Sequence, residues 1–193
     1  MHSLAPRSGL EHLTSAAGLA DGSAFSMVLR DGFALANVLV RKQHEAEFHR
    51  RVRSAYRLEL PTTPRRLANG AISFAWAGPG HWLGMTEGKP GHLFETDLRK
   101  DLAGVAYVSD QSDGRTVMRV SGKRARDVLA KGAPIDLHPR SFAVNDTAVT
   151  AIAHIGVHLW QIDELPTYEL AVFRSYSDAF WRWLIQTSAE FRA

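Results

Sequence analysis

The stretch between residues 110 and 139 decides the fold, and it contains DQSDGR (110–115), TVMRV (116–120), SGKRARDVLAKG (121–132) and PIDLHP (134–139). A turn rich in Asp and Gly precedes an apolar run that favours a strand, and Ser121-Gly122 then leads into a helix. We expect this helix to span residues 123–131 and to end at Gly132, before Pro134. The stretch holds no nucleophile with a base, no metal cluster and no complete phosphate cradle, so it indicates an ordered fold without obvious chemistry.

The residues before this stretch begin with two apolar runs, at residues 26–30 and 33–40. Asp31-Gly32 separates them, and this dipeptide supplies the positive φ angles of a tight hairpin. A helix over residues 43–56 should follow, because apolar residues recur there at helical spacing. The expected inward side chains of this helix are Phe48, Val52, Ala55 and Tyr56.

Three more strands and a helix complete this first part of the chain. Strands are expected at residues 71–76, 81–85 and 105–108, and Gly78-Pro79-Gly80 forms a hairpin turn between the first two. Gly91 should open a helix whose inward residues are Leu93, Phe94, Leu98 and Leu102.

The last part of the chain predicts a hairpin, a strand and a closing helix. The hairpin joins residues 148–155 to 157–162 across Gly156, and a strand follows at 168–173. The closing helix spans 178–191 with Ser177 as its N-cap. It should bury Trp181 and leave Trp183 facing outward, since these two residues lie on different sides of a helix. The other expected inward residues are Phe180, Leu184, Ile185 and Ser188.

Together these elements predict an α+β fold of two ferredoxin-like α/β halves that share one sheet system. Residues 26–109 form the first half and residues 110–193 the second. Residues 1–25 are small, polar and Gly-rich, which favours an N-terminal arm that orders only in a complex.

Composition excludes several classes of function. The 193 residues are 45% hydrophobic and contain no Cys, so disulfides, thiolate metal sites and a cysteine nucleophile are excluded. No secretory signal and no membrane-spanning run is visible, which favours a cytoplasmic protein without a membrane partner. The net charge of +3 is too small to indicate by itself that the protein binds nucleic acid.

Several polar residues invite a chemical interpretation, but a structural one is favoured for each. His154 and His158 could point the same way from a hairpin, yet a zinc site needs three or four ligands, and His81, His138 or carboxylates would have to supply the rest. Ser121-Gly122-Lys123-Arg124 could hold an anion but lacks the upstream glycines of a phosphate loop, so a plain tight turn is favoured. Ser141 follows His138 without the surroundings of a nucleophile. The Asp residues expected to cap turns are Asp110, Asp113 and Asp146.

Five sequence stretches resemble the gamma subunits of heterotetrameric sarcosine oxidases, from about Ser26 to the C-terminus. They are GPGHWL (78–83), DQSDGR (110–115), SGKRARDVLAKG (121–132), IDLHP (135–139) and FWRWL (180–184). The resemblance implies a fold similar to the folate-binding domain of the glycine-cleavage aminomethyltransferase. It also implies a complex whose beta subunit carries FAD, whose alpha subunit carries NAD and the tetrahydrofolate site, whose alpha/beta boundary holds FMN and whose delta subunit holds zinc.

The resemblance gives the gamma subunit no flavin and no catalytic residue, so we assign no catalytic, cofactor-binding or metal-ligating residue to this chain. The resulting hypothesis is a non-catalytic subunit of an enzyme that demethylates sarcosine to glycine, passes the one-carbon unit to tetrahydrofolate and reduces oxygen to hydrogen peroxide. We expect alpha to be its main contact, with beta and delta as further partners. The candidate interface residues are Trp183, Arg182, Arg7 and Leu10.

Two alternatives belong to other functional classes. The first is a free-standing folate-dependent protein of the aminomethyltransferase superfamily, which would need a carboxylate facing a pterin-sized pocket. The second is an RNA-binding module that uses the basic residues between Arg41 and Arg66. A solvated helix face explains those basic residues more simply.

Overall fold

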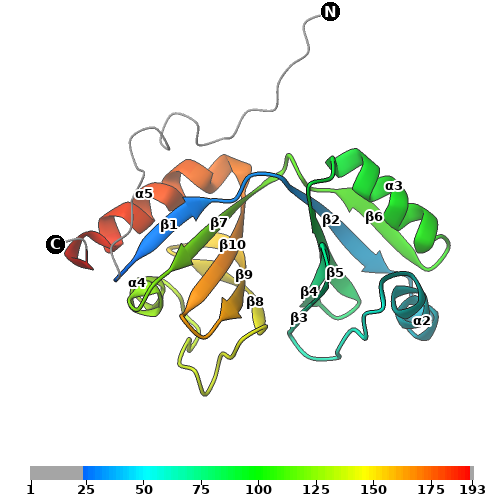
Figure 1. Ribbon diagram of the computed structural model, residues 1–193, viewed down its shortest axis with the longest axis horizontal. Coiled ribbons are helices and arrows are strands. Elements are labelled where there is room, and N and C mark those ends of the chain that lie inside the picture. Colours follow the sequence, from blue (N-terminus) through cyan, green and yellow to red (C-terminus); the bar gives the residue numbers. More distant parts are fainter. Residues whose placement is uncertain (1–23, 192–193) are drawn as a thin grey trace, which may run out of the picture.

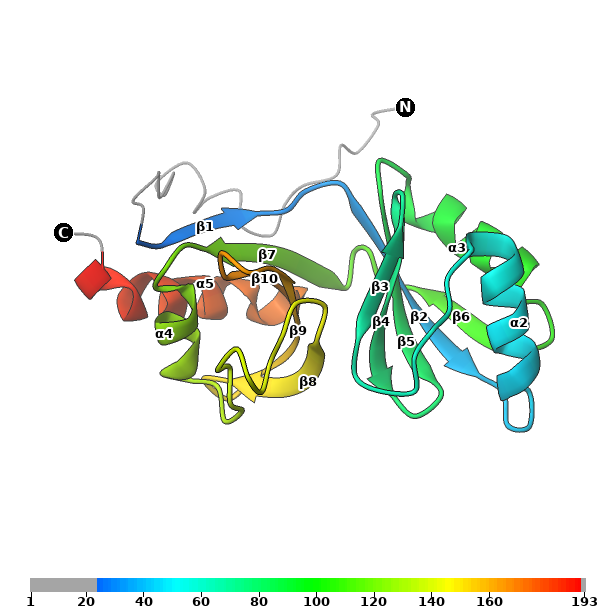
Figure 2. The ribbon, with the colours of Figure 1, turned by 60° about the horizontal axis from the view of Figure 1, so that its bottom comes forward.

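The computed structural model describes residues 24–191, and these form two five-stranded antiparallel sheets that face each other (Figure 1). Helices cover the outer face of each sheet, so the order of layers is helices, sheet, sheet, helices (Figure 2). The expected α+β class is confirmed. No helix in the described part of the chain is long and apolar enough to cross a membrane.

The first sheet contains five strands in the order β3-β4-β5-β2-β6. These are β2 (Phe33–Val40), β3 (Arg66–Asn69), β4 (Ile72–Gly78), β5 (His81–Glu87) and β6 (Ala106–Asp110), and the helices are α2 (Glu45–Tyr56) and α3 (Gly91–Asp101). Apart from the edge strand β3, they follow the β-α-β-β-α-β order of a ferredoxin-like half. The expected turn at Gly78-Pro79-Gly80 joins β4 to β5.

The second sheet has the order β1-β7-β10-β9-β8. Its strands are β1 (Ser26–Leu29), β7 (Arg115–Ser121), β8 (Thr147–Ile152), β9 (Ile155–Asp163) and β10 (Thr167–Phe173). Its helices are α4 (Ala125–Ala130), the short 3₁₀ turn η1 (Arg174–Tyr176), α5 (Ser177–Thr187) and the 3₁₀ turn η2 (Ala189–Phe191).

The expected hairpin between the first two strands is wrong. β1 pairs with β7, whereas β2 pairs with β5 and β6 in the other sheet. Gly32 does adopt a positive φ of 83°, but the Arg30 N–H donates to the Val117 carbonyl and keeps the chain on β7. The expectation of one shared sheet system is therefore also wrong. A local turn signal permits a hairpin but does not choose the partner of either strand.

The proposed division into halves at residues 26–109 and 110–193 stays a prediction. Strand β1 lies before residue 109 in the chain but in the sheet built from the later residues. Arg30, Asp31 and Gly32 form the link between the two sheets.

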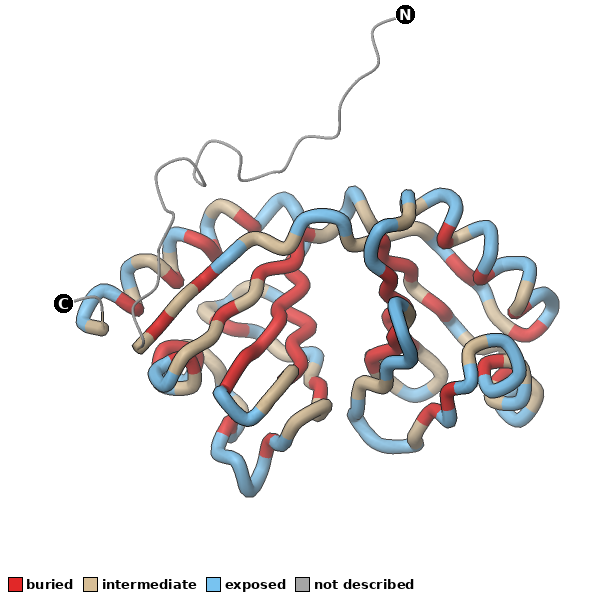
Figure 3. Tube along the Cα trace, viewed as in Figure 1, coloured by how far each residue is buried: buried red, intermediate tan, exposed pale blue. Residues whose placement is uncertain are grey.

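Each sheet packs its own core of buried residues against its helices. Figure 3 shows buried positions in runs along the central strands and at intervals along the helices. In α2, Phe48 and Val52 are fully buried as predicted, but Ala55 is exposed. In α3, Phe94 and Leu98 are buried, whereas the expected inward residue Leu93 is 46% exposed. Leu93 and Phe94 are adjacent on the helix, so a single sheet face cannot bury both equally.

Two expected details of the second half are also corrected. The β8–β9 turn consists of Ala153 and His154, both with positive φ, and Gly156 lies inside β9. Two central residues with positive φ are the geometry of a type I′ hairpin, whose twist suits the strands. Ser177 is the first residue of α5 and not its N-cap, because its hydroxyl donates back to the Arg174 carbonyl.

The inner faces of the two sheets meet in a third core. Seven buried residues form it, namely Leu35, Ala75, Leu83, Met85, Val117, Trp160 and Ala171. Glu169 lies beside this core on β10 and its side chain is only 2% exposed. Its carboxylate accepts hydrogen bonds from Arg119 at 2.6 and 3.1 Å and from the Trp160 indole at 2.9 Å. Arg30 lies 3.3 Å from the same carboxylate and 2.8 Å from that of Glu87 in the first sheet, so the charges join the two sheets.

His158 is a second buried polar group between the sheets. Its Nε2 lies 3.1 Å from the Trp76 carbonyl and 2.8 Å from the Thr147 hydroxyl, which itself donates to the Leu159 carbonyl. A carbonyl only accepts, so Nε2 carries the proton and the ring is the neutral donor. Burial, together with the charge of Arg115, lowers the pKa of His158 to about 3.

Replacement of Glu169 tests the charged link between the sheets. We expect Glu169→Gln to lower the free energy of unfolding by about 3 kcal/mol, because Arg119 and Arg30 lose a buried counter-charge. The matched control is Glu87→Gln, which removes a 56% exposed partner of the same Arg30 and should cost less than about 1 kcal/mol. Urea denaturation of the purified variants measures both values, and equal losses would contradict the assignment.

The neutral state of His158 predicts an acid-sensitive stability. Between the unfolded pKa of about 6.5 and the folded pKa of about 3, the unfolded chain binds a proton that the folded chain does not. The free energy of unfolding should therefore fall as the pH drops below 6.5, by up to about 1.4 kcal/mol per pH unit from this group. His158→Gln should reduce this slope in urea denaturation between pH 7.5 and 4.5.

The control for this pH measurement is His154→Asn in the exposed β8–β9 turn, where Asn tolerates the positive φ of 65°. This variant should keep the slope of the unaltered chain. A His158→Gln protein with an unchanged slope would show that other groups produce the acid sensitivity.

Candidate functional site

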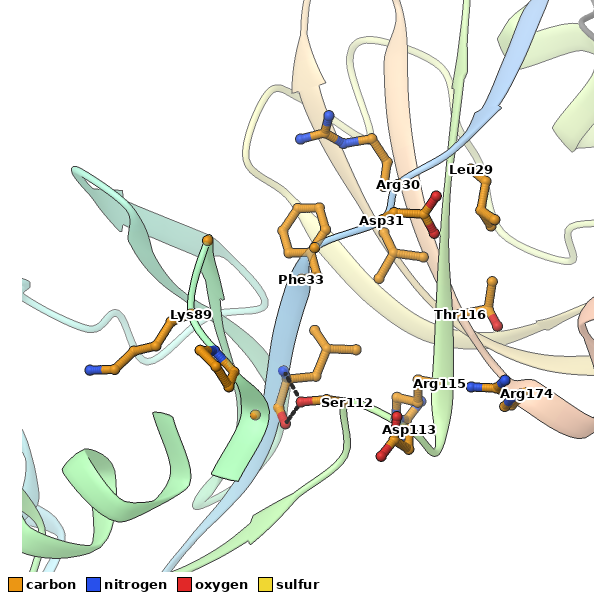
Figure 4. A pocket seen from close by; sticks show the side chains of 16 residues that line it. Leu29, Arg30, Asp31, Phe33, Lys89, Ser112, Asp113, Arg115, Thr116 and Arg174 are labelled. Atoms are coloured by element: carbon orange, nitrogen blue, oxygen red, sulfur yellow. Dashed lines mark hydrogen bonds between the residues drawn. The ribbon is translucent and has the colours of Figure 1, made fainter. Parts of the chain in front are cut away.

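A cleft of about 590 Å³ lies where segments from both sheets meet (Figure 4). The link between β1 and β2 forms one wall, and the segment between β5 and α3 forms another. The turn between β6 and β7 and the first residues of β7 close the remaining side. Its charged lining residues are Arg30, Asp31, Lys89, Asp113, Arg115 and Arg174.

The cations of this cleft mostly interact with the protein itself. Arg30 is held by Glu87 and Glu169, and Lys89 pairs with Asp97 and extends away from the other labelled side chains in Figure 4. Arg115 lies over the Phe173 ring, 4.5 Å from its centroid, and burial lowers its pKa. Arg30 and Lys89 are therefore engaged in ion pairs within the protein, whereas Arg115 is held by its contact with the Phe173 ring.

The DQSDGR stretch forms one wall of the cleft through a closed set of turn contacts. The Ser112 N–H donates to the Asp110 carboxylate at 2.9 Å, so Asp110 caps this turn as expected. The Leu35 N–H donates to the Ser112 hydroxyl at 3.0 Å. A Cβ added at Gly91, the first residue of α3, would collide with the Asp110 carboxylate and the Ser112 hydroxyl. These side chains therefore occupy the space before the N-terminus of α3.

The sequence-predicted histidine pair is not brought together. His154 is exposed at the tip of the β8–β9 turn, whereas His158 is buried between the sheets. His81 lies at the start of β5, and its pKa is lowered by burial and by the charge of Arg115. Residues 24–191 contain no cluster of three or more His, Cys, Asp or Glu side chains that is suited to a metal ion.

A second depression, of about 520 Å³, lies between the segment 63–65 and the loop before β8. Ser141 donates its hydroxyl proton to Asp136 at 2.6 Å, and this hydrogen bond holds the pKa of Asp136 below its usual range. His138 Nδ1 accepts the Arg140 N–H at 3.2 Å. Ser141 and His138 are therefore engaged in turn contacts rather than as nucleophile and base. The Asp146 carboxylate likewise accepts the Ala143 N–H at 2.8 Å, as expected for a turn.

The turn before α4 holds no free cradle for an anion. The Ala24 carbonyl accepts the Arg124 N–H at 2.7 Å, and a Cβ on Gly122 would approach the same carbonyl to 2.7 Å. Gly122 has a φ of 104°, which favours glycine. The plain tight turn predicted at Ser121-Gly122 agrees with these contacts.

The basic residues between Arg41 and Arg66 do not form one stripe. Arg50 and Arg51 pair with Glu47, and Arg53 pairs with Glu59. Arg66 is on the inner side of the first sheet, opposite Ala75, where burial lowers its pKa. Their dispersal weighs against a continuous surface for RNA, although RNA binding itself stays untested.

The candidate interface residues have different surroundings. Trp183 is half-buried against the core of the second sheet rather than fully outward-facing. Its ring stacks on Phe180 at 5.6 Å between centroids and lies against Gly132. Arg182 is exposed and pairs with Asp178 at 3.0 Å. Arg7 and Leu10 lie outside the described residues, and the role of all four in an interface stays a prediction.

Sequence reasoning missed Glu169, the most engaged polar group between the sheets. The signal for it was present, since Glu169 is the one charged residue in the strand TYELAVF (167–173). A charge within a strand buried on both faces needs a partner there. The sequence does not show which arginines supply it, because Arg30 and Arg119 belong to other strands and links.

Comparison of sequences identifies the family. A family profile described as "Sarcosine oxidase, gamma subunit family" matches residues 42–190. A sarcosine oxidase subunit gamma from Arthrobacter sp. is 35% identical over 190 residues, which cover 96% of this chain and 91% of the relative. The subunit gamma from Corynebacterium sp. strain U-96 is 30% identical over 192 residues, covering 97% and 92%.

Comparison of structures agrees. A chain of the heterotetrameric sarcosine oxidase from Corynebacterium sp. U-96, in complex with pyrrole 2-carboxylate, matches with a TM-score of 0.86 and 27% identity over 97% of both chains. Aminomethyltransferase T of the glycine cleavage system from Bartonella henselae matches with a TM-score of 0.64 and 12% identity, over 84% of this chain and 45% of that one. The second match confirms the expected likeness of fold. The chain belongs to the sarcosine oxidase gamma subunit family.

Proposed function

We propose that this chain is a non-catalytic structural subunit of a heterotetrameric sarcosine oxidase. The enzyme would demethylate sarcosine to glycine, pass the one-carbon unit to tetrahydrofolate and reduce oxygen to hydrogen peroxide. The observation that carries this proposal is the match to a chain of the Corynebacterium oxidase over 97% of both chains. A match over nearly the whole length of both chains favours the same place in an assembly.

The non-catalytic role is supported by how the polar side chains are used. Glu169, His158 and Ser141 all bond to groups of this chain. A catalytic acid, base or nucleophile needs access to a reacting atom in an open site. Side chains that are committed to the fold in this way favour support over chemistry.

The partners and cofactors of the proposal lie outside this chain. The likeness to aminomethyltransferase T covers only 45% of that protein, so this chain would supply at most part of the walls of a folate pocket. We therefore propose that the alpha subunit is the main contact and holds NAD and tetrahydrofolate. FAD would belong to the beta subunit, FMN to the alpha/beta boundary and zinc to the delta subunit, and the assembly would act in the cytoplasm.

Co-expression with the three companion subunits tests this function. A tag on this chain should retain all four subunits in equal amounts, and the purified assembly should release hydrogen peroxide when sarcosine is added. The isolated chain should lack flavin absorbance, sarcosine oxidation and heat of tetrahydrofolate binding in calorimetry.

Two results would contradict the proposal. One is turnover of sarcosine, or binding of flavin or tetrahydrofolate, by the isolated chain. The other is failure of the wild-type chain to join the companion subunits. The first would favour a free-standing folate-dependent or flavin-dependent protein.

A further inference from the structure

The inner face of the first sheet is only partly covered by the second sheet. Along β2, the inner residues change from buried Leu35 through half-buried Asn37 to Leu39, which is 48% exposed. On the edge strand β6, the inner residue Tyr107 is 58% exposed. Each sheet buries its outer face against its own helices, so this uncovered area lies on the face that elsewhere forms the third core.

Six residues on the inner faces of the two sheets make up what we call the aromatic–arginine patch. They are Leu39, Arg41, His81, Tyr107, Arg115 and Phe173. The strand register places Leu39 directly opposite both His81 on β5 and Tyr107 on β6. Residues opposite each other in antiparallel strands share a face of the sheet.

The second sheet contributes the other side of the patch. Arg115 lies opposite Phe173 in the register of β7 and β10, on the same face as Val117 and Ala171 of the third core. Phe173 is 45% exposed. Burial and the charge of Arg115 both lower the pKa of His81, so groups of the two sides interact electrostatically.

Both arginines of the patch lie over aromatic rings. The Arg41 guanidinium is 4.6 Å from the centroid of Tyr107, and that of Arg115 is 4.5 Å from the centroid of Phe173. Such stacking holds a guanidinium flat on the surface and leaves N–H groups at its edge for a carboxylate. Arg41 Nη1 donates to the Gly104 carbonyl at 3.3 Å, and Nη2 remains for a partner. The Nε atoms of both arginines are buried and have no hydrogen-bond partner within the described structure.

The charges of the patch are not balanced within it. None of its six residues is acidic, and neither Arg41 nor Arg115 makes an ion pair with any residue in the described range. Other arginines of the chain are paired, such as Arg51 with Glu47 and Arg182 with Asp178. Exposed aromatic residues beside arginine are the composition of interface centres.

We propose that the aromatic–arginine patch binds an acidic segment of a companion subunit, and this inference rests on the proposed function. Carboxylates of that segment pair with Arg41 and Arg115, while its apolar side chains cover Leu39, Tyr107 and Phe173. A second copy of this chain does not fit the patch, because a symmetric contact would place arginines against arginines.

Variants of the four-subunit complex test the patch. Arg41→Glu and Tyr107→Glu should each raise the dissociation constant of this chain from its companions at least about tenfold. Matched controls lie outside the patch: Arg140→Glu reverses an exposed charge in the loop before β8, and Leu165→Glu replaces an apolar residue that is 76% exposed. Each control should change the dissociation constant less than about twofold, and circular dichroism should show an unaltered fold for all four.

Salt dependence gives a second measurement that does not require charge reversal. The dissociation constant of the wild-type chain should rise with sodium chloride, and Arg41→Gln should reduce this rise. If the wild-type chain joins the complex and the patch variants join equally well, the patch is not the docking site. If Arg182→Glu weakens binding more than Arg41→Glu, the interface lies on α5 instead. A wild-type chain that does not join at all overturns the proposed function itself.

Discussion

A carboxylate buried between two sheets is the constraint on which this structure depends. The Glu169 carboxylate is held there by Arg119 on the neighbouring strand, the Trp160 indole and Arg30. Arg30 lies on the link between the sheets and also holds Glu87 of the first sheet. Sliding one sheet over the other would separate these charges in a medium of low polarity, so the network favours one relative placement.

In this arrangement helices cover the outer faces of both sheets, whereas part of the inner face of the first sheet stays uncovered. Helices α2 and α3 cover the first sheet, and α4 and α5 cover the second. The third core fills only part of the space between the sheets, and the residues beyond it are aromatic and basic. A subunit whose polar side chains are committed to its own fold, and whose unbalanced charges lie on an uncovered face, is suited to assembly.

The local elements were predictable where one segment carries the whole signal. Helical spacing identified Phe48 and Val52 as buried, and the Gly-Pro-Gly turn located the β4–β5 hairpin. Errors arose where a choice depended on distant segments. Leu93 has the spacing of an inward residue but is exposed, and Trp183 was expected to face outward although Phe180 and Gly132 lie against it.

The sequence by itself determined the alternation of strands and helices, the turn chemistry at residues 110–115 and the resemblance to the gamma subunits. Only the tertiary structure decided that β1 pairs with β7 and not with β2. It also decided that His154 and His158 lie apart and that Glu169 forms ion pairs with Arg30 and Arg119. The physical reason is the range of the interactions. Periodicity and turn preference act over a few residues, whereas strand pairing and the solvation of a buried charge depend on groups fifty or more residues apart.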